Sequence, residues 1–163
     1  MMDKNTKVLE YLLTCPNIAG TPLYFNLINA KNDSKQFITT ANDKYLNRTY
    51  VDGSIAKQYQ FTLIIYKALS DNSIVNGHIT QDENIEDMFD IQALIDWITE
   101  QEYIHNYPDF GEDCVVEAIA TTTENPSLNV IDMGVSPNLA EYSITININY
   151  IDYSKIVWNK QEG

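Results

Sequence analysis

The segment Asp87–Gln101 constrains the fold more than any other part of the chain, because its apolar residues follow a helical period on two sides. One stripe, at three- and four-residue steps, contains Met88, Ile91, Leu94, Ile95 and Ile98. A second stripe, at four-residue steps, contains Phe89, Ala93 and Trp97, and is flanked by Glu86, Asp90 and Glu100. A helix on one core needs only one apolar stripe. Either another helix of the same chain covers the second stripe, or another subunit does, which makes Phe89, Ala93 and Trp97 interface candidates.

Around this helix, expected over residues 83–104, most of the chain has the pattern of strands. Alternating apolar residues predict strands over residues 23–28, 36–40, 55–69, 113–123 and 141–151. Residues 3–14 are typical of a helix that Asp3 or Asn5 caps and Pro16 ends. The order α-β-β-β-α-β-β predicts a single α+β domain over residues 1–163, with a mostly antiparallel sheet covered by one long helix and an N-terminal helix. We expect a hairpin between the first two strands, and loops over residues 71–81 and 122–139.

Residues 41–54 have a different composition from the segments around them. They are polar, and Lys44, Tyr45, Arg48 and Tyr50 are interleaved. A long loop inside a compact domain is usually functional or partly disordered. We therefore expect a mobile loop or arm that becomes ordered against a neighbouring protein, with Tyr45, Arg48 and Tyr50 as interface candidates. The tail from about residue 159 is also expected to be mobile.

The strand expected over residues 141–151 has two contrasting faces. One face is apolar and should lie on the core; it contains Tyr142, Ile144, Ile146, Ile148 and Tyr150. The other contains Ser143, Thr145, Asn147 and Asn149 and carries no charge. An uncharged polar face is typical of a surface that packs against another protein or lines a polar channel.

The net charge of −13 is distributed unevenly along the chain. Residues 68–154 contain seventeen acidic residues and no lysine or arginine, whereas residues 1–67 have a net charge of +3. Conventional binding to the nucleic-acid backbone needs clustered Lys and Arg, so we do not expect it. The acidic segment serves solubility alone, repels polyanions or meets a basic partner.

Catalytic and cofactor-binding signatures are absent from the sequence, and we assign no catalytic, cofactor-binding or metal-binding residue. His105, Asp109, Glu112 and Cys114 form only a weak metal-ligand pattern, and His105 with Cys114 a weak nucleophile pair. Asp87 and Asp90 are weak as an acid–base pair. For His105, a cap at the end of the acidic helix is the better interpretation. No segment is long and apolar enough for a membrane span, and Cys15 and Cys114 form no disulfide framework, so a cytoplasmic setting is expected.

Four segments in a characteristic order carry a resemblance: Tyr50-Val-Asp-Gly-Ser54, the helix with Asp96-Trp97, Asn106-Tyr-Pro-Asp-Phe-Gly111, and Glu141-Tyr-Ser-Ile-Thr145. From about Val8 to Trp158, the chain resembles a minor capsid or tail-terminator family of long-tailed phages and prophages of Gram-positive bacteria. The resemblance implies a small α+β subunit that assembles as a ring, expected to be a homohexamer. Such a ring ends the tail tube and offers a face to the head–tail connector. The family has no catalytic residues to transfer.

The resemblance also implies partners and a location. The expected partners are further copies of the chain, the tail tube protein and the head–tail connector protein, and the location is the virion, with host cytoplasm during assembly. DNA would pass through the lumen without specific binding. The lumen candidates are Glu86, Asp90, Glu100, Ser143, Thr145, Asn147 and Asn149. The alternatives are a head-completion protein of the neck, a prophage interaction module that forms no ring, and a small enzyme.

Overall fold

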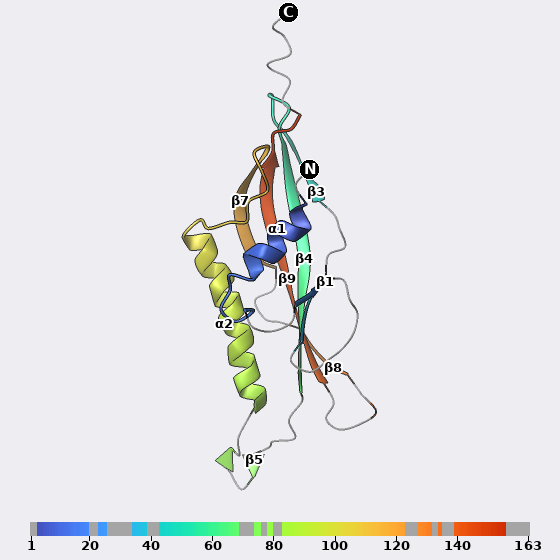
Figure 1. The fold of residues 1–163 in the computed structure, drawn as a ribbon, viewed down its shortest axis with the longest axis vertical. Helices are drawn as coiled ribbons and strands as arrows, with labels where there is room; N and C mark the ends of the chain where they lie inside the picture. Colours follow the sequence, from blue (N-terminus) through green and yellow to red (C-terminus); the bar gives the residue numbers. More distant parts are fainter. Residues whose placement is uncertain are drawn as a thin grey trace, which may run out of the picture.

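The computed structural model is an α+β fold in which two helices lie on a mostly antiparallel, curled sheet (Figure 1). It describes residues 3–19, 23–25, 34–38, 43–68, 74–75, 78–79, 83–122, 127–131, 134 and 139–155. The elements are α1 (Lys4–Leu12), β1 (Leu23–Phe25), β2 (Ser34–Ile38), β3 (Asp43–Thr49), β4 (Ile55–Ala68), β5 (Ile74–Val75), β6 (His78–Ile79), α2 (Glu83–Tyr103), β7 (Cys114–Thr121), β8 (Ser127–Ile131) and β9 (Leu139–Asp152).

The antiparallel pair β4–β9 runs along the long axis of the molecule and positions the other strands (Figure 1). Its register is continuous, from Ile55 opposite Asp152 to Ala68 opposite Leu139. Fourteen residues of strand span roughly 45 Å. Strands β2 and β3 pair with successive parts of β4, and β7 and β8 pair with successive parts of β9. The β4–β9 ribbon is therefore the element on which the rest of the sheet is built.

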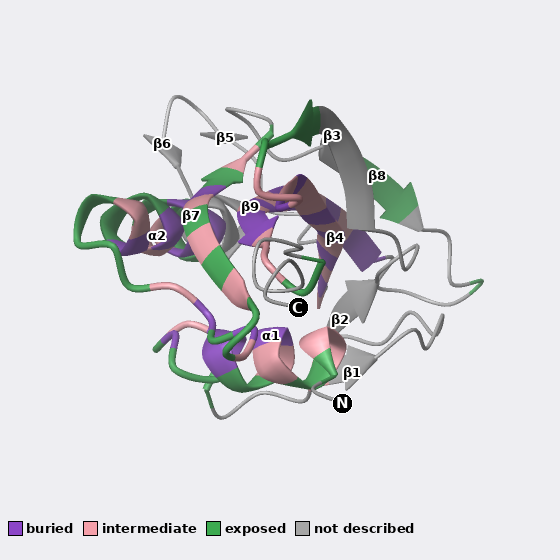
Figure 2. Ribbon diagram, turned by 90° about the horizontal axis from the view of Figure 1, so that it is seen from above, coloured by how far each residue is buried: buried purple, intermediate pink, exposed green. Residues whose placement is uncertain are grey.

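One face of the ribbon forms the hydrophobic core. The predicted apolar face of β9 is confirmed, because Tyr142, Ile144, Ile146, Ile148 and Tyr150 are all buried. Alternate residues of β4 are buried beside them, together with the apolar faces of both helices: Tyr59, Phe61, Leu63, Ile65, Val8, Leu12, Ile91, Leu94, Ile95 and Ile98. Figure 2 shows buried, intermediate and exposed positions on both helices, and the buried ones belong to the same core as the buried residues of the ribbon. Both described helices thus lie on the same face of the ribbon.

The helix ends follow from local hydrogen bonding. The Asp3 carboxylate accepts a hydrogen bond from the Asn5 backbone N–H at 2.9 Å, which confirms Asp3 as the cap of α1. At the end of α2, the Asn106 N–H donates to the Gln101 carbonyl and the His105 N–H donates to the Glu102 carbonyl. His105 adopts the left-handed conformation (φ 55°) that this type of helix cap requires. His105 therefore ends α2 through its backbone conformation, whereas the predicted interaction of a cationic His105 ring with the helix end stays a prediction.

Three segments predicted as loops contain strands. Strand β3 lies within residues 41–54, β5 and β6 lie within residues 71–81, and β8 lies within residues 122–139. These strands were missed because they pair with neighbouring strands through backbone hydrogen bonds, which need no apolar alternation in the sequence. The predicted hairpin between the first two strands is also wrong, because β1 and β2 pair in parallel. The polar residues between the two strands indicate a connecting segment, but they do not determine whether the second strand runs parallel or antiparallel to the first. Residues 26–28, 39–40 and 156–163, including the predicted mobile tail, lie outside the described residues.

Candidate interaction surfaces

The face of the ribbon that points away from the core carries a row of neutral polar side chains. We call this set the uncharged face: Gln58, Gln60, Thr62, Ser143, Thr145, Asn147 and Asn149. All seven side chains are half-buried. The sequence placed the four β9 members on one face. The three β4 members were missed as site residues, although their alternation along residues 58–62 was visible.

Side chains of the uncharged face bond to one another across the two strands. The pairs are Gln58 Nε2 to Asn149 Oδ1 at 3.0 Å, Gln60 Nε2 to Asn147 Oδ1 at 2.9 Å, and Thr62 Oγ1 with Thr145 Oγ1 at 3.0 Å. On β7, Ala118 lies opposite Asn149 and Ala120 opposite Asn147, so small side chains border the row. The amide and hydroxyl groups satisfy part of their hydrogen-bonding capacity within the row. The result is a neutral surface with no acid, base or nucleophile among its seven members.

The second stripe of α2 is covered at one end and open at the other. The Trp97 indole is half-buried, and its ring centroid lies 5.2 Å from that of Tyr11 in α1, with the rings tilted by 49°. Ala93 is half-buried, and Phe89 is 69 % exposed. A helix of the same chain therefore covers the Trp97 end of the stripe. Phe89 remains an open apolar side chain on the surface of α2.

The acidic lumen candidates lie on the other side of the sheet from the uncharged face. Asp90 and Glu100 are exposed on α2, which packs on the core face of the ribbon. Glu86 also belongs to α2, but its side chain lies outside the described part of the chain. The two sets of candidates therefore do not share one surface, and a single lumen wall contains one set or the other.

Within the segment predicted as a mobile loop or arm over residues 41–54, residues 43–54 form strand β3 and the turn of its hairpin with β4. In its turn, the Tyr50 N–H donates to the Ser54 carbonyl at 2.9 Å, and Gly53 has a φ of 93°. The Asp52 carboxylate accepts hydrogen bonds from the Ser54 hydroxyl and the Ser54 N–H, which lower the Asp52 pKa. These hydrogen bonds stabilise the turn.

The hairpin turn displays an apolar side chain that sequence reasoning missed. Val51 is fully exposed, between the exposed Tyr50 and the hydrogen-bonded Asp52. The signal in the sequence was a valine directly before Asp-Gly, where a polar residue is more usual. Arg48 is exposed at the end of β3, and the Tyr45 backbone lies opposite Lys57, while its side chain is outside the described residues.

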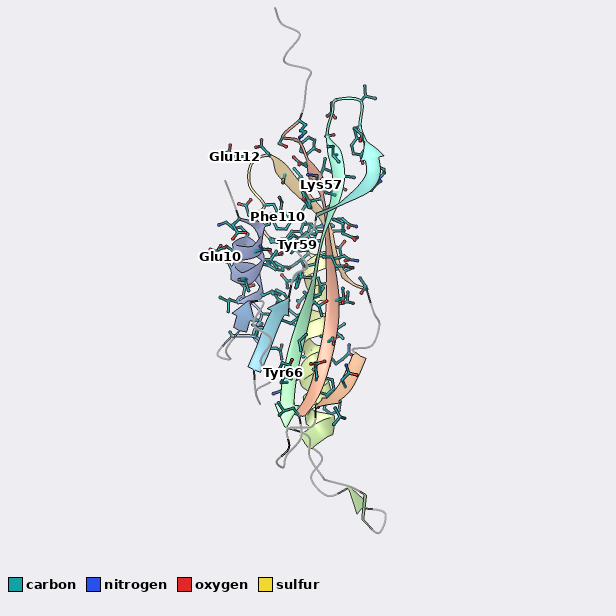
Figure 3. The ribbon with its side chains drawn as sticks, turned by 90° about the vertical axis from the view of Figure 1, so that its right-hand side faces the viewer. Glu10, Lys57, Tyr59, Tyr66, Phe110 and Glu112 are labelled. Carbon is teal, nitrogen blue, oxygen red and sulfur yellow. The ribbon has the colours of Figure 1, made fainter. Side chains whose placement is uncertain are left out.

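A charged pair closes the core at the same end of the ribbon. Lys57 Nζ lies 3.0 Å from Asp152 Oδ2, and the Ser154 N–H donates to Asp152 Oδ1 at 2.9 Å. Burial of Asp152 opposes its ionisation, but the hydrogen bonds from Ser154 and Lys57, with the Lys57 charge, outweigh burial and lower the Asp152 pKa to about 2. Figure 3 shows Lys57 above Tyr59 and Phe110, toward the hairpin end.

This pair predicts a defined loss of stability in acid. The folded-state pKa of Asp152 lies below the value of about 3.9 expected in the unfolded chain. Its contribution, about 1–2 kcal/mol, is thus complete above about pH 5 and is lost as the pH falls from there through about 2. In urea unfolding measured between pH 5 and pH 2, Asp152→Asn should flatten this dependence, and Lys57→Gln should reduce it, because loss of the Lys57 charge raises the folded-state pKa of Asp152 toward its unfolded value. An unchanged profile in both variants would contradict the assignment.

The weak chemical candidates are not brought together. The His105 ring Nδ1 lies 2.9 Å from the Tyr107 hydroxyl. Cys114 is half-buried. Burial, and to a lesser extent the negative charge of the nearby Asp152, raise the pKa of its thiol, which disfavours a reactive thiolate. Among the residues with described positions, no three His, Cys, Asp or Glu side chains are grouped to hold a metal ion. In the same part of the chain, neither helix combines the length and apolar character needed to cross a membrane.

Three candidate interaction features therefore lie on different parts of the fold: the uncharged face, the exposed Phe89 on α2, and the hydrogen-bonded turn that carries Val51. Comparison of the chain with protein-family models and with curated proteins finds no match in either set.

Proposed function

We propose that the protein is a structural subunit of a phage tail or neck, and that six copies form a ring that ends the tail tube and joins it to the head–tail connector. The resemblance over about Val8–Trp158 is the source of this proposal. The observation that supports it best is the division of the β4–β9 ribbon into two faces. One face is used for the core of the subunit, and the uncharged face carries neither described helix.

A neutral face suits the wall of a channel through which DNA passes. Lysine or arginine side chains on such a wall would bind phosphates and release counterions, which gives strong, salt-sensitive retention. The uncharged face offers amides and hydroxyls that are already paired with one another. In this arrangement, the uncharged face lines the lumen, and Asp90 and Glu100 of α2 point to the outside or to a neighbouring subunit.

The mass of the native particle tests the ring. The subunit mass is 18.6 kDa, so light scattering or native mass spectrometry should give about six times this value. Negative-stain images of the same sample should show closed rings with a central opening. A monomer at high protein concentration would contradict the ring and favour an interaction module that forms none.

The second stripe of α2 provides a pair of variants that separates assembly from folding. Phe89→Ala should leave the free energy of unfolding within about 0.5 kcal/mol of the wild type, because the side chain is exposed. If Phe89 anchors a subunit contact, the variant should weaken association by about 2 kcal/mol, or thirtyfold. Trp97→Ala should instead lower the free energy of unfolding by about 2–4 kcal/mol, because it removes the packing on Tyr11.

Chemical denaturation and dilution of the ring measure the two effects in the same samples. If Phe89→Ala assembles as tightly as the wild type, the open end of the α2 stripe is not a subunit contact. If Trp97→Ala keeps wild-type stability but dissociates the ring, the indole acts between subunits despite its contact with Tyr11.

A further inference from the structure

Strand β7 combines an unpaired edge with a sequence that favours strand pairing. Among the strands that the structure describes, β7 pairs with β9 alone, and we call the side of β7 that points away from β9 the β7 edge. The eight residues Cys-Val-Val-Glu-Ala-Ile-Ala-Thr contain one charge and no proline or glycine. Edges with high strand propensity and little charge are templates on which a strand of another chain can add. The β7 edge is therefore a place where two copies of the chain could join.

A carboxylate from α2 occupies a backbone donor of this edge. The Ile119 N–H donates to Glu102 Oε2 at 2.8 Å. Figures 1 and 2 both show α2, which carries Glu102, beside β7. The Ile119 side chain is buried in the core, which fixes the position of this N–H. A backbone N–H has one proton to donate, so an added strand can pair here only if it displaces the carboxylate.

The position of Glu102 is unfavourable for the helix itself. Glu102 lies in the last turn of α2, where the helix dipole disfavours an anion, and that turn contains no basic residue. Burial raises the pKa of the Tyr107 hydroxyl, and a hydrogen bond with Glu102 raises it further. The carboxylate therefore has partners in Tyr107 and Ile119, outside the helix, that offset its unfavourable place at the helix end.

The first half of the β7 edge is interrupted by a bulge. The register with β9 shifts between Val116 and Ala118, so Glu117 between them has no partner in the ladder. Glu117 is exposed and is the only charged residue of β7. Bulges and charged side chains both disfavour the addition of a further strand at a sheet edge. Glu102 and Glu117 thus act on successive parts of the same edge.

We propose that Glu102 blocks the β7 edge against strand pairing with a second copy of the chain, and that the Glu117 bulge assists it. The inference goes beyond the proposed function and does not depend on a ring. A sheet that continues from copy to copy needs two free edges and gives an open filament unless the rotation between copies closes it. Blocking one long edge prevents this growth, so the chain can associate only through side-chain surfaces.

The test compares Glu102→Ala with the wild-type full-length protein. Hydrogen exchange at the Ile119 amide should be about tenfold faster in the variant, because the N–H has lost its acceptor. Sedimentation velocity should show particles larger than the native wild-type particle, whatever the mass of that particle. Thioflavin T fluorescence should rise with particle size, as expected for chains that join strand to strand.

Three further variants separate the edge from general effects on folding. Glu102→Gln keeps an oxygen that can accept the Ile119 hydrogen bond and should behave like the wild type. Glu100→Ala removes a carboxylate from an exposed position of the same helix and should also behave like the wild type. Val115 is 51 % exposed on β7. Adding Val115→Lys to Glu102→Ala should restore most of the wild-type particle size while exchange at Ile119 stays fast, because a lysine on an edge strand opposes pairing.

Each outcome decides for or against the blocked edge. Wild-type particle size in Glu102→Ala overturns the proposal, and so do larger particles that Val115→Lys does not reduce, since these come from unfolded chains. Glu102→Gln that self-associates as strongly as Glu102→Ala overturns the role of the hydrogen bond. If Glu102→Ala does not fold, Glu102→Met replaces it, because methionine has a similar length but accepts no strong hydrogen bond. If Glu102→Met also unfolds, the carboxylate is a requirement of the fold and the proposal is rejected. A wild-type monomer contradicts the ring alone, because the blocked edge is measured relative to the native particle.

Discussion

Replacing Phe110 by alanine should lower the free energy of unfolding by about 3–5 kcal/mol. Phe110 is 4 % exposed and joins the segment after α2 to the ribbon. Its ring centroid lies 5.8 Å from that of Tyr59 and 5.2 Å from that of Tyr150, and both pairs meet edge to face. Figure 3 labels Phe110 beside Tyr59. Removing the ring loses these contacts and leaves a cavity that the two strands cannot close, because their register is fixed over fourteen residues.

Urea unfolding at neutral pH measures this effect, with Tyr103→Ala as the matched control. Tyr103 is an aromatic residue in the same part of the chain, but it is 84 % exposed, so its removal should change stability by less than about 0.5 kcal/mol. A loss below about 1 kcal/mol for Phe110→Ala would show that the aromatic cluster does not hold this segment to the sheet. A large loss for Tyr103→Ala would indicate that the exposed end of α2 is buried in solution, as it would be in an assembly.

The core of this fold could be predicted from sequence because the apolar residues that periodicity places on one face are the residues that become buried. Tyr142, Ile144, Ile146, Ile148 and Tyr150 alternate in sequence and all lie in the core. The helix expected over residues 83–104 is observed as Glu83–Tyr103, since its core stripe and its cap at His105 agree on where it ends. Local sequence was therefore sufficient to predict the elements whose apolar periodicity matches one face of the core.

The strands at the sides of the sheet could not be predicted in this way. Strand β3, with Lys44, Asn47 and Arg48, pairs with β4 through its backbone, and no apolar face marks it. Strand β8 is five residues long and lies among turn-forming residues, which predicted a loop. In both cases the partner is the next strand of the chain, and it supplies the stabilisation through backbone pairing rather than through an apolar face. Local composition carries no information about such pairing.

The candidate surfaces were predictable only in part for a related reason. The neutral row of β9 was evident from alternation, but its bonds to Gln58 and Gln60 depend on the register between β4 and β9. The second stripe of α2 was evident too, but the cover of Trp97 by Tyr11 depends on the position of α1. Periodicity identifies which residues share a face, whereas tertiary packing decides which of those faces remain open.

Two lysines on the uncharged face should convert a ring that does not retain DNA into one that binds it tightly at low salt. The variant carries Thr145→Lys and Asn147→Lys, and the stems of the new side chains can extend along the ribbon while their ammonium groups reach solvent. In a ring of six subunits, this change adds twelve cations to the proposed lumen. If six of them contact phosphates, the slope of log K against log salt is about −5, and affinity changes roughly a thousandfold between 50 and 200 mM salt.

The unmodified ring should bind double-stranded DNA no better than an uncharged protein of similar size, even at low salt. Screening lengths near 8 Å at physiological salt restrict any repulsion from the acidic segment to narrow parts of the channel. Neutrality of the wall, rather than long-range repulsion, is therefore the property that matters for passage. Fluorescence anisotropy of a short labelled duplex, titrated at several salt concentrations, measures both the affinity and its slope.

Glu100→Lys is the matched control, because it changes the charge by the same +2 per subunit on the helix side of the sheet. If the uncharged face lines the lumen, the double lysine variant should bind DNA with an affinity that falls steeply as the salt concentration rises. Glu100→Lys should bind DNA weakly. In infected cells, the double variant should give tails of normal length that eject DNA slowly. Strong binding by Glu100→Lys alone would instead place the acidic side of α2 in the lumen. Tight, salt-sensitive binding by the unmodified ring would contradict passive passage and favour a neck component that handles DNA directly, because only a surface with accessible cations can retain phosphates in that way.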